Sequence, residues 1–263
     1  MKQIVYSTPS GEYFNLYRDM LAAGHTLIAG ATGSGKSTVI SGLIHTALYE
    51  SPASAQFVLI DPKRVDMIEY SALPHVLRYA TEPQQIAEAL SFAITYMESR
   101  YQYMARNRLK EFDGAMVYVI IDEVADLLTD TASKRVFSPM IQRLAQLGRA
   151  ARITVIMATQ CCLASVLTTA IKCNFSSRLA LRTATAQDSR NIIDQKGAET
   201  LPDPRTEGRA CGIWRNGANT ECFNLPRYDE AERQRLIDHW EDRRNIRRQR
   251  KQFSIFGFGR RSA

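Results

Sequence analysis

The residues best suited to chemistry in this chain lie in one octapeptide, Gly30-Ala31-Thr32-Gly33-Ser34-Gly35-Lys36-Ser37. It fits the spacing G-x-x-x-x-G-K-[ST], in which glycines let backbone N–H groups turn inward around phosphate oxygens. Lys36 is placed to reach the β- and γ-phosphates of a nucleotide, and Ser37 to hold a Mg²⁺ ion. The spacing therefore predicts a phosphate-binding loop whose contacts are Gly30, Ala31, Thr32, Gly33, Ser34, Gly35, Lys36, Ser37 and Thr38.

The sequence on both sides of this loop favours that interpretation. Residues 25–29 form a short apolar run typical of a buried strand, and residues 38–48 carry apolar side chains at helical spacing. A helix that begins at Lys36 or Ser37 would point its N-terminus at the phosphates. The alternative is a glycine-rich hairpin that matches the spacing by chance.

An acidic pair and an amide side chain follow two later apolar runs. Asp122-Glu123 comes directly after residues 116–121, where we expect Asp122 to hold Mg²⁺ through water and Glu123 to polarise an attacking water molecule. Gln160 follows residues 153–159 and is a candidate to sense the γ-phosphate or to orient that water. A helix cap is the alternative for the acidic pair, since Asp often begins helices.

The rest of the chain alternates apolar strands with amphipathic helices, which predicts an α/β fold with a mostly parallel sheet. The run 56–61 ends in Asp61-Pro62, at the edge where such sheets bind ligands, although a simple turn is an alternative. Asn216-Gly217 between apolar runs predicts a β-hairpin. We expect helices over 13–21, 81–109, 132–151, 186–194 and from 229, hairpin strands over 210–215 and 220–224, and another strand over 176–182.

Composition narrows the class of protein. The chain has 263 residues, of which 45% are hydrophobic and 23% charged, and it contains no apolar run near the ~20 residues that span a bilayer. Its first residues lack the apolar core of a signal peptide, so we expect a cytoplasmic location. The five cysteines form no C-x-x-C pair, which favours reduced, structural thiols.

The net charge of +7 is uneven along the chain. Residues 241–263 contain eight Lys or Arg and two acidic residues, so this tail carries most of the net positive charge. If the last helix continues, its basic stripe is a candidate contact for nucleic acid; a solvated end and a segment lying on anionic lipid are the alternatives. The stripe consists of Arg244, Arg247, Arg248 and Lys251.

Taken in order, these motifs resemble the motor domain of the FtsK/SpoIIIE family of DNA translocases, from about His25 to Phe223. The resemblance implies a RecA-like P-loop NTPase core of the additional-strand type, with a catalytic glutamate, a mostly parallel sheet flanked by helices, and a C-terminal β-hairpin and helix. The matching stretches are 25–37, 59–63, 120–127, 143–146, 148–151, 158–160, 188–195 and 197–199.

The same resemblance implies a ring, usually hexameric, that hydrolyses ATP with Mg²⁺ between subunits and pumps double-stranded DNA through its centre. On that basis Arg149 is a candidate arginine finger that reaches a neighbour's γ-phosphate. Arg143, Arg178 and Arg190 compete for this role, and a favourable interaction with a helix C-terminus is a simpler account of Arg149.

The sequence departs from the family pattern in two places. Cys161-Cys162 stands where the family usually has Arg-Pro, and residues 201–208 replace its glycine-rich stretch. We also expect no membrane anchor and no winged-helix DNA reader, which favours a stand-alone motor (1–228) with a C-terminal helix and basic tail (229–263) that could bind a recruiting protein. The alternatives for function are a type VII secretion-like ATPase that moves protein, or a nucleotide-switched scaffold.

Overall fold

The computed structural model describes residues 6–7, 13–208, 210–225 and 231–240. In this part of the chain, ten strands form one sheet in the order β2-β1-β10-β9-β8-β3-β7-β6-β4-β5. The six strands from β8 to β5 are parallel, and β9, β10, β1 and β2 extend the sheet in antiparallel fashion. The mostly parallel α/β sheet that the sequence predicts is therefore confirmed.

The strands are β1 (Tyr6–Ser7), β2 (Tyr13–Phe14), β3 (Thr26–Ala29), β4 (Ala55–Ile60), β5 (Val76–Ala80), β6 (Met116–Ile121), β7 (Ile153–Thr159), β8 (Ser177–Leu181), β9 (Ala210–Asn216) and β10 (Asn219–Leu225). The α-helices are α1 (Leu16–Ala23), α2 (Lys36–Glu50), α3 (Pro83–Asn107), α4 (Ala125–Leu128), α5 (Thr131–Leu147), α6 (Thr169–Lys172), α7 (Ala186–Ile193) and α8 (Pro204–Glu207). Two 3-10 helices, η1 (Ile68–Ala72) and η2 (Ala198–Thr200), and a helix over 231–240 complete the described elements.

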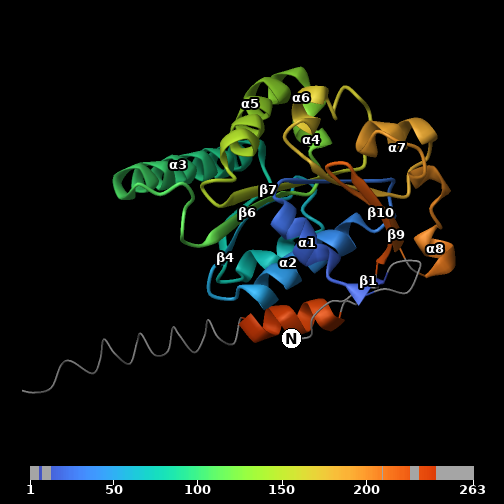
Figure 1. The fold of residues 1–263 in the computed structure, drawn as a ribbon, viewed down its shortest axis with the longest axis horizontal. Coiled ribbons are helices and arrows are strands. Elements are labelled where there is room, and N and C mark those ends of the chain that lie inside the picture. The colour runs from blue at the N-terminus through green and yellow to red at the C-terminus, as the bar shows by residue number, and fades with distance from the viewer. Residues whose placement is uncertain (1–5, 8–12, 209, 226–230, 241–263) are drawn as a thin grey trace, which may run out of the picture.

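Helices cover both faces of the parallel strands (Figure 1). On one face, α3, α5 and α7 bury apolar side chains against the sheet; on the other, α1, α2 and the helix over 231–240 do so. Every residue of β3 and of β7 is buried, which is why these strands are almost continuously apolar instead of alternating.

The order of the central strands decides which loops can meet. β7 lies between β3, which precedes the phosphate-binding loop, and β6, which precedes Asp122-Glu123. This inserted strand is the additional-strand arrangement. Because β3, β6 and β7 are parallel, their carboxyl ends meet at one edge of the sheet, where ligands of such folds bind.

Several boundaries differ from the sequence-based expectation. The helix expected over 13–21 is a short strand, β2, followed by α1, because the Asn15 side chain accepts a hydrogen bond from the Arg18 N–H and caps a later start. α3 is capped by Glu82, not Thr81, in a reciprocal pair with Gln85. The hairpin of β9 and β10 has the expected turn, with Gly217 at φ +61°.

The last expected helix lies partly outside the described residues. Asp229, its expected start, is outside them, whereas the helix over 231–240 packs Leu236, Ile237 and Trp240 into the same core as α1 and α2. The division at 228/229 therefore stays a prediction. Within the described ranges, no helix combines the length and apolar character that crossing a bilayer requires.

Candidate nucleotide-binding site

The loop from Gly30 to Gly35 connects β3 to α2 at the carboxyl edge of the sheet. Gly33 and Gly35 have φ of +77° and +104°, in the left-handed region that glycine adopts readily. Gly35 is also the N-cap of α2, so the orphan N–H groups of this helix face the loop. The Lys36 ammonium folds back to donate to the carbonyl oxygens of Gly30 and Ala31, at 2.7 and 3.0 Å.

The phosphate-binding loop fits a bound nucleotide. The Ser34 hydroxyl is buried and has no hydrogen-bond partner among the described residues. Burial lowers the pKa of Lys36, although the nearby Glu123 acts to raise it. A phosphate would give the Lys36 ammonium and the loop N–H groups the anionic partner that this geometry favours. Ser37 and Thr38 follow Lys36 in the first turn of α2.

Glu123 is almost completely buried and is held by four donors. The Thr159 hydroxyl donates to Oε1 at 2.6 Å, and the backbone N–H of Gln160 reaches Oε2 at 3.0 Å. The Lys63 ammonium lies 3.2 Å from Oε2, and the Ala125 N–H reaches Oε1 at 3.4 Å. These contacts hold the Glu123 side chain in one position beside the phosphate-binding loop, as a water-polarising group requires.

Asp122 lies in a strongly acidic environment. Burial, together with the neighbouring carboxylates of Asp66, Asp61 and Glu123, raises its pKa to about 7. Asp61 is fully buried, and its Oδ1 has no partner within the described part of the chain. A divalent cation would relieve this repulsion, so the residues fit the Mg²⁺ ion that Ser37 and Asp122 are expected to hold. Such an ion would neutralise charge on the phosphates.

Gln160 joins β7 to the phosphate-binding loop. Its Oε1 accepts a hydrogen bond of 2.6 Å from the Thr32 hydroxyl. The same residue donates its backbone N–H to Glu123. The structure thus brings together four of the residues that the sequence singled out, Thr32, Lys36, Glu123 and Gln160.

Three further residues at this edge of the sheet were not among the predicted site residues. Lys63 and Thr159 contact Glu123 directly, and Arg205 donates to the Thr32 carbonyl oxygen at 2.9 Å. The first two lie in the stretches that carry the family resemblance, and their position next to strand ends was a usable signal. Arg205 lies in the segment that departs from the family pattern, so the resemblance could not point to it.

Arg149 lies at the opposite edge of the sheet. It precedes β7, and its guanidinium donates to the Ala23 carbonyl oxygen at 3.1 Å. Arg143 pairs with Glu98 of α3, and Arg190 is exposed on α7. Within one chain none of these arginines contacts the phosphate-binding loop, so a finger role for any of them requires a second subunit.

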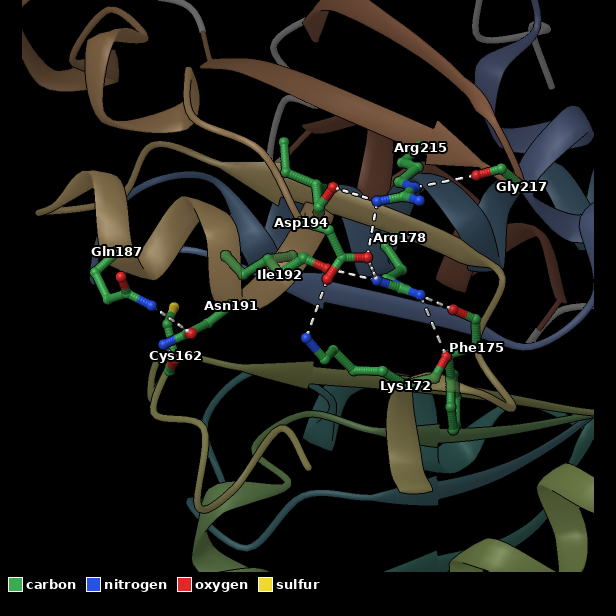
Figure 2. Close-up of polar contacts among 11 residues, drawn as sticks. Cys162, Lys172, Phe175, Arg178, Gln187, Asn191, Ile192, Asp194, Arg215 and Gly217 are labelled. Atoms are coloured by element: carbon green, nitrogen blue, oxygen red, sulfur yellow. Dashed lines mark hydrogen bonds and ion pairs between the residues drawn. The ribbon is translucent and has the colours of Figure 1, made fainter. Parts of the chain in front are cut away.

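Arg178, the remaining finger candidate, is held in a cationic cluster at the same edge. Figure 2 shows Arg178 and Arg215 converging on Asp194, each at 2.7 Å from Oδ2, while Lys172 lies 3.1 Å from Oδ1. Arg178 also donates to the carbonyl oxygens of Phe175 and Ile192. Burial would raise the pKa of Asp194, but the hydrogen bonds from Arg178 and Lys172 hold it below its ordinary value.

The candidate nucleic-acid residues of the tail lie outside the described residues. They are Arg244, Arg247, Arg248 and Lys251.

The fold and this site have the arrangement of a P-loop NTPase core of the RecA type. Residues 10–116 match the model of the FtsK/SpoIIIE family. The chain is 41% identical over 204 residues to the DNA translocase FtsK of Chlorobaculum tepidum and 38% identical to that of Lactiplantibacillus plantarum, each match covering 70% of this chain and 25% of the relative. The predicted resemblance to the FtsK/SpoIIIE family is confirmed. The chain spans about a quarter of the length of these curated relatives.

Solved structures share the fold. The pCW3 conjugation coupling protein TcpA superposes with a TM-score of 0.72 at 23% identity, over 88% of this chain and 68% of that one. The cytoplasmic domain of the type VII secretion ATPase EccC of Thermomonospora curvata gives 0.74 at 21% identity, over 91% and 32%. At these identities the likeness establishes the fold alone.

Proposed function

We propose that this chain is an ATP-driven motor that moves double-stranded DNA. The observation that carries the proposal is the position of Glu123, which Thr159 and Gln160 fix beside the phosphate-binding loop. The Lys36 ammonium of that loop folds back over it and contacts the Gly30 carbonyl oxygen. In this arrangement Lys36 binds phosphate oxygens, Glu123 takes a proton from the attacking water, and Gln160 orients that water. Ser37 and Asp122 hold Mg²⁺.

The proposed motor works as a ring, hexameric in the simplest case, in which each ATP lies between two subunits. The phosphate-binding loop and Glu123 lie at the carboxyl edge of the sheet, whereas Arg149 lies at the amino edge. A finger at the amino edge can therefore act only on a neighbour's nucleotide. We assign this role to Arg149, with Arg178 as the competitor that Asp194 restrains.

Duplex DNA is the proposed cargo because the relatives that share 38–41% of aligned residues are named DNA translocases. Contacts of such a motor with the DNA backbone are independent of sequence and weaken with salt. The tail residues Arg244, Arg247, Arg248 and Lys251 are proposed to add to them, or to bind a recruiting protein. A role in DNA transfer, segregation or packaging, in the cytoplasm, completes the proposal.

Steady-state ATP hydrolysis with duplex DNA, single-stranded DNA or no DNA tests this function. We expect strong stimulation by duplex DNA. Hydrolysis that ignores DNA even at low salt would contradict the cargo and favour a type VII-like motor for protein, and no hydrolysis at all would favour a nucleotide-switched scaffold. Deletion of residues 243–263 should lower DNA affinity and the salt dependence of binding if the tail contacts phosphates.

A further inference from the structure

A wall beside the phosphate-binding loop is formed by a segment that includes Leu181, Arg182, residues 203–205 and Ala210, on the side of β3 away from Glu123. A Cβ atom at Gly30 would lie 2.7 Å from Leu181 Cβ, one at Gly33 would lie 2.5 Å from Arg205 Nη2, and one at Gly35 would lie 2.9 Å from Ala210 Cβ. Each of the three glycines thus faces this segment, so the loop and the segment are packed as one unit.

Three hydrogen bonds and an ion pair hold this unit together. The Arg182 carbonyl oxygen accepts the Ala31 N–H at 2.8 Å, and the Arg182 guanidinium pairs with Asp203 at 3.0 Å. Asp203 caps α8 by accepting from the Arg205 N–H, and the Arg205 side chain then reaches the Thr32 carbonyl oxygen. These successive contacts therefore position the Arg205 guanidinium directly over the phosphate-binding loop.

A small cavity lies between this wall and the loop. Its volume is about 50 Å³, and it is lined by residues 31–34, Arg182 and 203–205. Ser34, only 3% exposed, is one of these lining residues, and its hydroxyl has no hydrogen-bond partner in the described part of the chain. Two guanidinium groups beside a phosphate-binding loop favour an anionic ligand, and the Asp203 carboxylate, which pairs with Arg182, also lines the cavity.

The order of the strands indicates which part of the nucleotide this cavity faces. β7 and β6, with Gln160, Asp122 and Glu123, lie on one side of β3, and β8, with Arg182 following its end, lies on the other. The proposed chemistry at the γ-phosphate lies on the side of β7 and β6. The side of β8 therefore faces the portion of the nucleotide that ADP and ATP share.

We propose that Arg205 is a nucleotide-binding residue in cis, which contacts the phosphate–ribose portion common to ADP and ATP and is positioned by the Arg182–Asp203 pair. This inference deepens the proposed function and depends on its nucleotide site. Arg205 belongs to the segment that replaces the glycine-rich stretch of the family pattern, so part of the nucleotide affinity would depend on this replacement.

Calorimetric titration of the full chain with ADP and with a slowly hydrolysed ATP analogue tests the inference. Arg205→Ala should raise the Kd for both ligands roughly ten- to hundredfold, as expected for loss of a hydrogen bond to a charged group. Arg205→Lys should recover part of the affinity, because it keeps the charge but not the planar fork. The matched control, Glu207→Ala, changes an exposed residue of the same α8 and should bind like the wild type.

Three results would overturn the inference. An unchanged Kd for Arg205→Ala would remove Arg205 from the site, tighter binding would make it a steric block, and weaker binding of the ATP analogue alone would make it a γ-phosphate sensor. Lys36→Ala separates this inference from the site itself. Loss of binding in Lys36→Ala together with unchanged binding in Arg205→Ala refutes only the role of Arg205, whereas a wild-type chain that binds neither ligand refutes the nucleotide site.

Discussion

The hydroxyl of Thr32 in the phosphate-binding loop donates a 2.6 Å hydrogen bond to Gln160 Oε1 at the end of β7. Gln160 is also bonded through its backbone N–H to Glu123. One residue therefore connects the phosphate-binding loop to the carboxylate of Glu123.

This connection predicts non-additive effects on turnover. Gln160→Ala should lower kcat about a hundredfold, because the water loses an orienting group, with little change in ADP affinity. Thr32→Val should lower kcat less, since it removes only the bond that positions Gln160. The double variant should be no slower than Gln160→Ala in steady-state kinetics. Effects that simply multiply would show that the two side chains act independently.

Glu123→Gln should bind nucleotide but not turn it over. The amide keeps the shape and can still accept the bond from Thr159, but it cannot take a proton from water, so we expect kcat to fall by at least about a hundredfold. Single-turnover hydrolysis and ADP titration measure the two properties. Asp126→Asn, which changes an exposed carboxylate three residues further on, is the control and should keep normal turnover. Equal loss in both variants would remove Glu123 from its role.

His25 should make stability depend on pH. Its Nδ1 accepts the Val155 N–H at 2.9 Å, and burial, with Arg149 nearby, lowers its pKa to about 4 from 6.5. The neutral ring therefore stabilises the fold fully above about pH 6.5, and this contribution, about 3 kcal/mol at most, is lost as the pH falls toward 4.

Urea unfolding at pH 7 and pH 5 measures this effect. His25→Asn, whose amide oxygen can replace Nδ1 as acceptor, should be less stable at pH 7 but lose less stability between the two pH values than the wild type. Equal losses in both proteins would show that other groups dominate acid sensitivity.

Asp194 should be important for stability because it joins three cations in a left-handed turn. It ends α7 at φ +60° and pairs with Lys172, Arg178 and Arg215. Asp194→Ala should lower the free energy of unfolding by about 1–3 kcal/mol, since the three cations then repel one another without a counter-charge.

Asp194→Asn separates charge from backbone conformation in the same thermal or urea unfolding measurement. Asn adopts left-handed turns readily, so a loss close to that of Asp194→Ala would assign the effect to the charge. Full stability of Asp194→Asn would contradict the electrostatic account and assign the loss to the turn.

The sequence predicted the strand before the phosphate-binding loop and the helix after it, and both are confirmed. The glycines at 33 and 35, the strand before the loop and the acidic pair after β6 are consecutive residues whose types dictate their own backbone geometry. Hydrophobic periodicity predicted helix starts less well, because the capping side chain decides where a helix begins. α1 begins three residues later than expected, and α3 is capped one residue beyond Thr81.

The sequence alone determined that a phosphate-binding loop and an acidic pair follow apolar strands, because each of these features depends only on the types of consecutive residues. Only the tertiary structure decided that Thr32 meets Gln160, 128 residues away, that Arg205 lies over Thr32 from 173 residues away, and that Arg178 is held by Asp194. These partners depend on the order of β8, β3, β7 and β6 in the sheet, and local periodicity carries no information about which strands lie side by side.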